Sequence, residues 1–357
     1  TPPTLASPNP DTLVTNAVMT AQSAISAPDF PPLRAIVHGS VPNSHPSTSA
    51  ASELVGIVSK LVQSSLQPSS IPTYKRAWRL FYQFIDSNLP GMPATMPISP
   101  PNIALFVANL YKRNYACSTV NTYVSAIGYS HKLSGFSDPT KVFFVLQMLK
   151  GYGKLHSRLD CRLPITLAVL HQVVQSADEI SFSLYDRSLF KAMCLFAFFT
   201  FSRIGEITAS TTGNNIQLHQ VSRLLDHNNH VDSIKVTFLQ FKHSYNQRPF
   251  SLTVSRQASF CPVEHLLSYL QLRGYDGGPL FRMADGSSVA KSFFNEKLVT
   301  VLKCCGLDPA RYKGHSFRIG AASHAAQKGM SDGQIRAMGR WKSNAFLKYI
   351  RLQSLIH

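Results

Sequence analysis

The stretch KGHSFRIGAASHAAQKGMSDGQIRAMGRWKSNAFLKYIR, residues 313–351, decides how the C-terminal part of this chain is organised. Gly314 interrupts regular structure, and Ser316 can then cap a helix start by accepting a hydrogen bond from a free main-chain N–H. Gly329 is well placed to end that helix, because glycine readily adopts the left-handed conformation that closes many helices. The pattern therefore predicts a helix over about 316–328.

Two further short helices are predicted in the same stretch. Ser331 and Gln334 have the spacing of a capping box, which indicates a second helix that ends near Gly339. Ser343 or the asparagine after it can begin a third helix, which carries Tyr349. Helices this short are stable only when they pack, so we expect the whole stretch to belong to a larger domain.

Several side chains in this stretch suit a phosphate. His315 and Arg318 are three residues apart on the first turn of the predicted helix, where free N–H groups also favour an anion. Tyr349 lies beside Lys348 and Arg351, on a face that meets solvent or a ligand. Each pattern alone is also common where there is no function, so it is their combination that indicates a functional site.

The composition favours a polyanionic partner. The chain has 357 residues, enough for two domains of ordinary size, and its hydrophobic fraction of 44% is normal for a globular protein. Its 35 Lys and Arg against 18 Asp and Glu give a formal charge of +17. A basic excess can serve solubility alone, but one of this size, spread along the chain, more often serves nucleic-acid binding.

Other sequence features exclude several classes of protein. No apolar run approaches the roughly 20 residues of a membrane span, and the N-terminus has no signal-peptide pattern, so we expect an intracellular chain without membrane contact. The six cysteines form no C-x-x-C pair, which predicts free thiols, mostly in the core, with neither a disulfide nor a metal site. The chain opens with Thr rather than Met, as a fragment or a trimmed chain would.

The N-terminal part does not resemble a folded domain. Residues 1–55 are rich in Pro, Ser, Thr and Ala with scattered apolar residues, which is typical of an arm that is disordered or ordered by a partner. Leu54 to Leu66 has apolar residues at helical spacing, so residues 56–69 are a candidate docking helix. Packing of this helix on the chain's own core is the alternative.

Residues 70–150 are predicted to form a small all-helical domain. From Ile71 onward one helical face is apolar, and the other carries Lys75, Arg76 and Arg79, a basic face suited to DNA. Three more helices are expected, over 101–113, 118–133 and 140–152.

Residues 151–164 are expected to form a solvated linker. The segment reads GYGKLHSRLDCRLP, and its glycines, its proline and the cations Lys154, Arg158 and Arg162 suit a crossing that lies along a phosphate backbone. A second domain is expected over 165–357.

Three elements are predicted early in that second domain. The apolar segment 189–207 indicates a buried central helix. Alternating apolar residues on both sides of HSYNQRP, residues 243–249, predict a β-hairpin over 231–254 with a mobile, basic tip. Residues 261–274 indicate another helix, which Gly274 closes.

Taken together, these features resemble the tyrosine recombinase (phage-type integrase) superfamily. Within it, the general character of the sequence is most similar to the eukaryotic mobile-element branch, DIRS-like and Crypton-like. FSRIGEI, residues 201–207, is similar to the family's R-x-x-E motif after an apolar helix, and GHSFRIGAAS, residues 314–323, is similar to its H-x-x-R box. The similarity covers about residues 70–351. It implies a mainly α fold with a small β-hairpin or sheet, in which a helical core-binding domain and a catalytic domain form a two-domain, C-shaped clamp around duplex DNA.

The resemblance also implies roles for individual residues. Tyr349 would attack the scissile phosphate, while Arg203 and Arg318 hold that phosphate, because each guanidinium presents a rigid, always-charged fork. His315 is implied as the base or as a hydrogen-bond donor to the phosphate. Lys242, which we expect at the end of the first hairpin strand, is implied as the general acid for the leaving 5′ oxygen.

Other positions match the family less directly. Lys235 is a weaker candidate than Lys242, and Glu206 either orients a site residue or is an ordinary carboxylate on a helix surface. The family places His or Trp nine residues before its nucleophile, whereas here Arg340 has that spacing and Trp341 is one residue closer. Either Trp341 packs over the site, which we favour, or Arg340 takes the role as a phosphate donor.

The activity implied by the resemblance is that of a site-specific DNA recombinase or transposase. Such an enzyme cuts and rejoins DNA through a 3′-phosphotyrosine intermediate without metal, cofactor or ATP. It works as a dimer or tetramer on double-stranded DNA, in the nucleus if the host is eukaryotic. Many members dock a helix after the nucleophile on a neighbouring protomer, whereas only eight residues follow Tyr349 here. Either the chain is truncated or the contact comes from elsewhere, for which the helix at 54–66 is our candidate.

Three alternatives to this activity remain open from the sequence. A type IB topoisomerase would share the chemistry, although the motif spacing fits the recombinases better. A domesticated protein with the same fold would bind DNA without cutting it. A scaffold that binds RNA is disfavoured, because the chain lacks aromatic-rich motifs for single strands.

Overall fold

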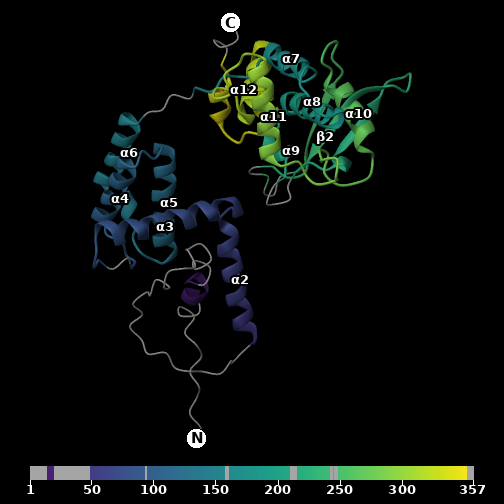
Figure 1. Ribbon diagram of the computed structural model, residues 1–357. Coiled ribbons are helices and arrows are strands. Elements are labelled where there is room, and N and C mark those ends of the chain that lie inside the picture. Colours follow the sequence, from purple (N-terminus) through teal and green to yellow (C-terminus); the bar gives the residue numbers. More distant parts are fainter. Residues whose placement is uncertain are drawn as a thin grey trace. The chain divides into compact units, whose positions relative to one another are not determined.

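The computed structural model describes residues 14–19, 49–92, 95–156, 161–209, 215–241, 244 and 248–351. The chain divides into two compact units, Thr1–Leu159 (unit 1) and Asp160–His357 (unit 2) (Figure 1). This division falls inside the stretch 151–164, where the sequence predicts a linker.

Unit 1 is built from helices around an aromatic core. Trp78 is fully buried, and its indole Nε1 donates a hydrogen bond to Ser130 Oγ at 2.9 Å. His131 stacks on Trp78 and accepts a hydrogen bond from the Ile98 N–H at 2.8 Å, which ties the loop before one helix to another. The elements are α2 (Ser49–Ser65), η1 (Pro68–Ser70), α3 (Ile71–Asn88), α4 (Pro100–Lys112), α5 (Cys117–Leu133), η2 (Pro139–Lys141) and α6 (Phe143–Leu155).

The helices of unit 1 depart from the sequence-based boundaries in two places. The segment 1–55, to which no fold was assigned, contains helical residues at 14–19 and the first turns of α2. Helix α6 continues to Leu155, so the first residues of the predicted linker are helical. Helices α2 and α6 thus extend beyond the predicted boundaries.

Unit 2 consists of helices around a small sheet. Helix α8 lies at its centre, against α10 and α12 (Figure 1). The elements are α7 (Leu167–Ser176), α8 (Leu184–Phe199), α9 (Ile204–Ile207), η3 (Leu218–Gln220), β1 (Val221–Leu225), β2 (Val231–Phe238), β3 (Phe250–Ser255), α10 (Pro262–Arg273), α11 (Lys291–Cys304), α12 (Gly314–Gln327), α13 (Asp332–Met338) and η4 (Asn344–Tyr349).

The sheet contains the predicted hairpin and one more strand. Strands β2 and β3 pair in antiparallel fashion from Phe238 opposite Phe250 to Ser233 opposite Ser255. Ile234, Val236 and Phe238 point into the core, as their alternation predicts. Strand β1, which the sequence-based prediction missed, pairs with the other edge of β2 and exposes most of its residues.

The predicted single helix over 189–207 is in fact two helices with a sharp turn between them. Helix α8 begins earlier, at Leu184, and ends at Phe199. Phe201 then adopts a left-handed conformation with φ of 52°, and the four-residue α9 follows. The turn redirects the chain, so Arg203 stands at the start of α9 instead of continuing along a buried helix.

The C-terminal stretch forms the predicted succession of short helices, with two corrections. Helix α12 begins at Gly314, and Ser316 lies inside its first turn, where its Oγ accepts the Lys313 N–H at 3.1 Å. The third element, η4, is a 3-10 helix rather than an α-helix. The capping box of Ser331 and Gln334 is present as predicted, and Ser343 caps η4.

Two glycines let α12 pack closely on its neighbours. A Cβ on Gly320 would lie 1.8 Å from the main-chain oxygen of Ile165, and a Cβ on Gly314 would lie 2.6 Å from the side chain of Ile204. The second contact brings α9 against the start of α12. These close approaches place the R-x-x-E and H-x-x-R motifs side by side.

Taken as a whole, the described residues form a mainly helical chain with one small antiparallel sheet, which confirms the predicted fold class. None of the described helices is long and apolar enough to cross a membrane. The six cysteines are free thiols, but only Cys194 and Cys261 are buried, so the expectation that most of them lie in the core is wrong.

Candidate active site

The hydroxyl of Tyr349 lies beside the imidazole of His315. His315 Nε2 and Tyr349 Oη are 2.8 Å apart, a hydrogen-bond distance. Both side chains are half-buried, which leaves them partly open to solvent. The first turn of α12 supplies His315 and the last residue of η4 supplies Tyr349, so the pair joins the two ends of the stretch 313–351.

Arg203 is held in place by Glu206. At the start of α9, Arg203 NH1 donates to Glu206 Oε1 at 2.8 Å, and the Arg203 main-chain N–H donates to Glu206 Oε2 at 3.0 Å. The Arg203 side chain remains 25% exposed, whereas Glu206 is buried. Of the two sequence-based readings of Glu206, a helix-surface carboxylate is therefore wrong. Glu206 fixes the guanidinium of Arg203 at a site that solvent can reach.

Arg340 contacts the same carboxylate from the interior of unit 2. Its NH2 donates to Glu206 Oε2 at 2.7 Å, and its guanidinium lies 3.7 Å from the centre of the Phe238 ring. The side chain is only 1% exposed, and the main chain of Arg340 is left-handed with φ of 55°. Among the described residues, its contacts are thus with protein groups behind the site.

Arg318 is fully buried beneath the pair of His315 and Tyr349. It donates hydrogen bonds to the main-chain oxygens of Phe201 and Gly339, and its Nε has no partner among the described residues. The left-handed turn at Phe201 presents one of these oxygens. Arg318 is therefore fixed on two sides by the backbone that surrounds the site.

Trp341 packs between Arg318 and Tyr349. The Arg318 guanidinium carbon lies 4.0 Å from the centre of the indole ring, and the ring of Tyr349 lies 5.2 Å from it. A Cβ on Gly339 would lie 1.5 Å from a Trp341 ring atom, so only glycine at that position leaves room for the indole. The indole thus forms a wall of the site, and Arg340 points away from it.

The charges around Glu206 influence one another. Burial by itself would raise the pKa of Glu206, but the guanidinium groups of Arg340, Arg203 and Arg318 outweigh burial and hold this pKa below its usual value. Burial, followed by repulsion from Arg203, lowers the pKa of Arg318 to about 9. Arg318 is therefore charged at neutral pH, and the site has a net positive charge that suits a phosphate.

The two predicted lysines have different positions. Lys242 lies outside the described residues, beyond the end of β2 at Phe238. Lys235 is exposed on β2, opposite Ser222 and Thr253, as expected of an outward-facing strand residue.

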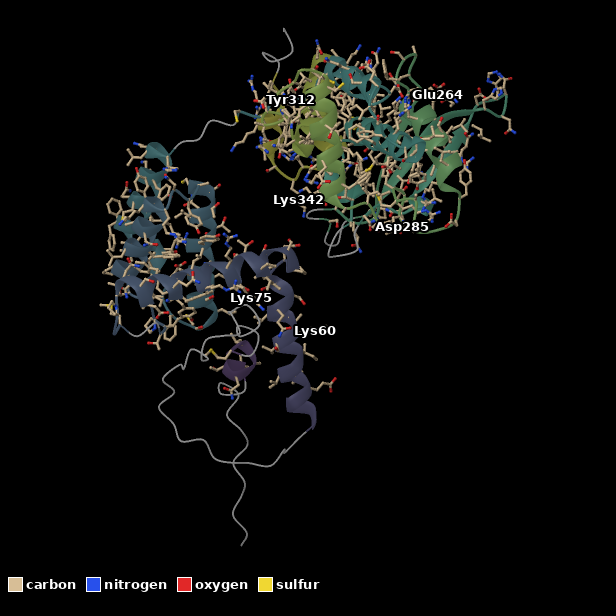
Figure 2. The ribbon with its side chains drawn as sticks, viewed as in Figure 1. Lys60, Lys75, Glu264, Asp285, Tyr312 and Lys342 are labelled. Carbon is tan, nitrogen blue, oxygen red and sulfur yellow. The ribbon has the colours of Figure 1, made fainter. Side chains whose placement is uncertain are left out.

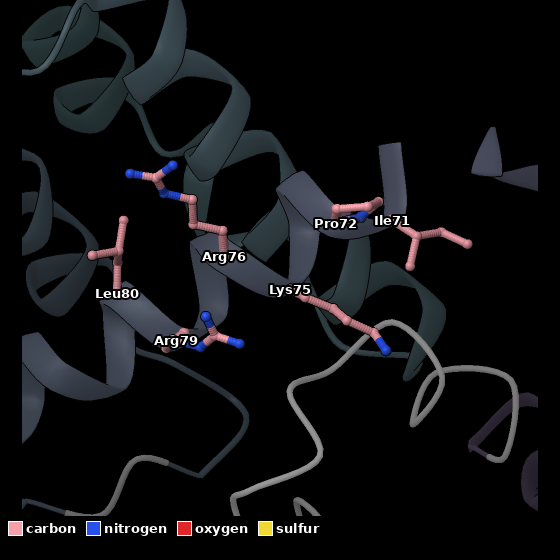
Figure 3. Close-up of a pocket in the computed structure, with 6 residues that line it drawn as sticks. All are labelled: Ile71, Pro72, Lys75, Arg76, Arg79 and Leu80. Atoms are coloured by element: carbon pink, nitrogen blue, oxygen red, sulfur yellow. The ribbon is translucent and has the colours of Figure 1, made fainter. Parts of the chain in front are cut away.

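The basic face predicted in unit 1 is present on α3. Arg76 and Arg79 are exposed and Lys75 is half-buried. Figure 3 shows these three side chains reaching out from α3 between Ile71 and Leu80, where they line a hollow of about 620 Å³. The face therefore offers three cations within little more than one turn of one helix.

The other residues predicted to contact DNA differ in their exposure to solvent. Lys154 and Lys348 are exposed. Arg351 is half-buried, and its guanidinium donates to the main-chain oxygen of Arg162. Arg158 lies outside the described residues.

Sequence reasoning missed a serine that fixes the end of η4. Ser323 Oγ donates to the main-chain oxygen of Tyr349 at 3.1 Å and accepts the Arg351 N–H at 2.9 Å. Ser323 closes the GHSFRIGAAS motif, but nothing in the sequence shows that it faces Tyr349. Within the described residues, no group of three or more His, Cys, Asp or Glu side chains is arranged as a metal site.

Comparison with known proteins identifies a fold. No protein-family model and no curated protein matches the chain. Among solved structures, XerH site-specific recombinase bound to palindromic difH substrate has a TM-score of 0.56 at 14% identity, over 96% of this chain and 92% of that one. A lambda integrase dimer bound to a COC′ core site has a TM-score of 0.54 at 13% identity, over 82% and 75% of the two chains.

A third similar structure is the Tn1549 transposon integrase in complex with circular intermediate DNA. Its TM-score is 0.55 at 12% identity, over 80% of this chain and 90% of that one. These neighbours are tyrosine recombinases, and the likeness extends over both units. The chain has the fold of the tyrosine recombinases.

Proposed function

We propose that this chain is a site-specific DNA recombinase that cuts and rejoins DNA through a 3′-phosphotyrosine intermediate. The observation that carries the proposal is the 2.8 Å contact of Tyr349 Oη with His315 Nε2, next to Arg318 and Trp341. A tyrosine hydroxyl is a modest nucleophile, and an adjacent base together with nearby cations makes its attack on phosphorus possible. His315 is our candidate for the base, and Arg318 is our candidate for a nearby cation.

In the proposed reaction, Tyr349 Oη forms a bond to phosphorus while the bond from phosphorus to the 5′ oxygen breaks. His315 accepts the phenol proton, and Lys242 returns a proton to the leaving 5′ oxygen as a general acid. The 3′ phosphate stays joined to Tyr349. Attack on that link by a 5′ hydroxyl of another strand regenerates the phenol and a new phosphodiester without ATP.

Arg203 and Arg318 would stabilise the charge that builds on the phosphate oxygens. Arg203 is the accessible one, since Glu206 orients it while its side chain stays 25% exposed. Arg318 donates to two main-chain oxygens, and a phosphate oxygen, which is the stronger acceptor, would compete for these donors. Trp341 limits where that guanidinium can move.

DNA binding and self-association are part of the proposal. The formal charge of +17 and the exposed cations of α3 suit a phosphate backbone, and the XerH, lambda and Tn1549 structures contain DNA. The similar lambda integrase structure is a dimer on its core site. Membership of the eukaryotic mobile-element branch and a nuclear location are supported by the sequence resemblance alone.

The direct test is a trapping experiment. The full chain is incubated with nicked duplexes tiled across the genomic DNA that flanks its gene, so that loss of a short strand prevents religation. We expect a protein–DNA adduct that survives denaturation for the natural chain and for Tyr275→Phe, a matched change at an exposed tyrosine away from the site. Tyr349→Phe should bind the same DNA and give no adduct.

Other outcomes separate the alternatives. If the natural chain binds a duplex tightly and no adduct forms on any substrate, the protein binds DNA without cutting it. Relaxation of supercoiled plasmid without strand exchange between duplexes would favour a topoisomerase. An adduct that persists in Tyr349→Phe would remove Tyr349 as the nucleophile.

A further inference from the structure

A pocket of about 400 Å³ adjoins the candidate active site in unit 2. This volume lies in the range of roughly 300–1,000 Å³ that holds small ligands in other proteins. It is bordered by a residue shortly after β2, by the first residue of β3 and by residues from α13 to the turn after it. The lining side chains that matter here are Phe241, Phe250, Trp341, Arg336, Arg340 and Lys342.

The pocket combines aromatic walls with positive charge. Its three aromatic side chains, Phe241, Phe250 and Trp341, are half-buried, so part of each ring is accessible. Arg336 and Lys342 are exposed at its margin; Figure 2 labels Lys342 at the surface of unit 2. Among the residues that the structure describes, none that lines the pocket is acidic. Aromatic faces with cations beside them are suited to a nucleotide, whose base stacks and whose phosphate is an anion.

Arg340 borders the pocket with a buried, charged side chain. Arg340 lines the pocket with a side chain that is 1% exposed, and its Nε has no hydrogen-bond partner among the described residues. Buried donors in folded proteins nearly always find an acceptor, because an unpaired one loses its hydration without compensation. The Nε atoms of Arg187, Arg273 and Arg318 are also buried without such a partner, so this feature is shared by several arginines of the chain.

The position of the pocket relates it to the candidate nucleophile. Trp341 lines the pocket and also contacts Arg318 and Tyr349. His315, Arg203 and Tyr349 are not among the pocket's lining residues, so the pocket is separate from the place of the attacked phosphate. The side chain of Trp341 would therefore lie between a ligand in the pocket and the groups Arg318 and Tyr349.

We propose that this pocket binds a single unstacked nucleotide of the bound DNA, next to the phosphate that Tyr349 attacks. The proposal rests on the proposed function. Its base would lie against Phe250 and Trp341, and its phosphate would meet Arg336 and Lys342. Stacking on aromatic side chains contributes about 1–3 kcal/mol per base, enough to offset a few kcal/mol of unstacking when the base is unpaired.

The first test uses tryptophan fluorescence of the full chain. The chain has two tryptophans, and Trp78 is fully buried in unit 1, so a base that stacks on Trp341 should quench one of them. The probe is 2′-deoxyadenosine 5′-monophosphate, compared with deoxyadenosine and with inorganic phosphate. We expect saturable quenching by the nucleotide, weaker effects of the two fragments, and no quenching in Trp341→Phe.

A charge-matched pair of double variants locates the binding site. Arg336→Gln with Lys342→Gln should weaken nucleotide binding about tenfold, the sum expected from two exposed cation contacts. Lys303→Gln with Lys328→Gln removes the same charge from exposed positions on α11 and after α12, and should leave affinity unchanged. Equal losses of nucleotide affinity in the two double variants would contradict the proposal that this pocket binds a nucleotide. The absence of saturable quenching by the nucleotide would contradict it as well.

The second test distinguishes a nucleotide within DNA from a free one. A duplex with one unpaired adenine is compared with the same duplex fully paired. We expect tighter binding of the unpaired duplex, and loss of this preference in Arg336→Gln with Lys342→Gln. Quenching by the mononucleotide without such a preference would make this a site for free nucleotides. Neither test requires DNA cleavage, so a negative result here does not contradict the proposed recombinase activity. Likewise, a failure to trap an adduct does not contradict nucleotide binding in the pocket.

Discussion

Arg340 and Glu206 form a buried ion pair, with Arg340 NH2 2.7 Å from Glu206 Oε2, and the other carboxylate oxygen holds Arg203. The two arginines thus share one carboxylate from opposite sides, Arg340 inside the protein and Arg203 at the accessible site. Nine residues before Tyr349, where the resemblance to tyrosine recombinases predicts His or Trp, this chain has a cation that supports the site from behind. Trp341, one residue later, is the side chain that packs against Tyr349.

Removing Arg340 should destabilise unit 2. Arg340→Met leaves the buried Glu206 with one partner fewer, and breaking a buried pair in this way costs about 3 kcal/mol or more. Adding Glu206→Gln should recover part of the loss, because a neutral amide needs no counterion. Urea unfolding measures both effects. Arg336→Met, at an exposed position on α13, is the matched control, and equal stability of the Arg340 and Arg336 variants would contradict a buried structural role.

Trp341 should matter for the reaction more than for DNA binding. Trp341→Ala removes the ring that packs on Arg318 and Tyr349, so both groups gain freedom. A misplacement of about 1 Å can cost on the order of a hundredfold in rate, and we expect a loss of that size in adduct formation. The affinity for a fully paired duplex, which offers no unpaired base to the pocket, should change by less than about threefold, since the salt-dependent phosphate contacts remain. A parallel loss of binding and adduct would argue for general unfolding instead.

Gly320 should tolerate no side chain. Gly320→Ala places a methyl group 1.8 Å from the Ile165 main-chain oxygen, so α12 or the segment before α7 must shift. We expect about 1–3 kcal/mol of destabilisation, as for overpacked cores. Gly333→Ala is the control, because it also lies in a helix and its Cβ would meet nothing closer than 3.9 Å. Thermal unfolding of the two variants side by side checks the prediction.

His131 should make unit 1 sensitive to acid. The Ile98 N–H donates to its Nε2 and its Nδ1 lies 2.8 Å from the Ile127 oxygen, which requires a neutral ring. Burial lowers the pKa of His131, against the smaller raising effects of the Ile127 contact and of Asp138. The folded pKa is therefore below the unfolded value near 6.5, so this stabilisation is complete above about pH 6.5 and is lost as pH falls.

The measurement is urea unfolding at pH 7.0 and about pH 5.5, followed by the fluorescence of Trp78 with Trp341→Phe introduced into both chains. The natural chain should lose stability between these values. His131→Gln should be less stable at pH 7, by about 1 kcal/mol for the impaired hydrogen bonds, and should depend less on pH. An identical pH dependence of both chains would show that another group is responsible.

DNA affinity should depend steeply on salt. Several phosphate contacts predict a loss on the order of a thousandfold between about 50 and 200 mM salt. If the basic face of α3 makes two of them, Lys75→Gln with Arg79→Gln should reduce the slope of log affinity against log salt by about 2. Lys60→Gln with Lys112→Gln, at exposed positions of unit 1, is the control. A flat salt response would exclude a phosphate clamp.

The sequence by itself determined the mainly helical fold, the hairpin and the succession of short helices that carries His315 and Tyr349. These features follow from local rules: apolar periodicity, capping serines and closing glycines act within a few residues. The same reasoning missed β1, whose exposed residues carry little periodic signal, and it extended α8 through Phe201. The left-handed turn there depends on contacts from Arg318 and Arg340, which are more than a hundred residues away.

Only the tertiary structure decided how the arginines are used. By spacing, Arg340 and Trp341 were both candidates for one position. The structure assigns them different places: the indole of Trp341 packs closely against Gly339 and faces Tyr349, whereas Arg340 pairs with the buried carboxylate of Glu206 in the interior. Likewise, Arg318 lies beneath the site because Gly314 and Gly320 let α12 approach its neighbours closely. Side-chain direction in a packed core depends on such long-range contacts, which residue types and spacing do not encode.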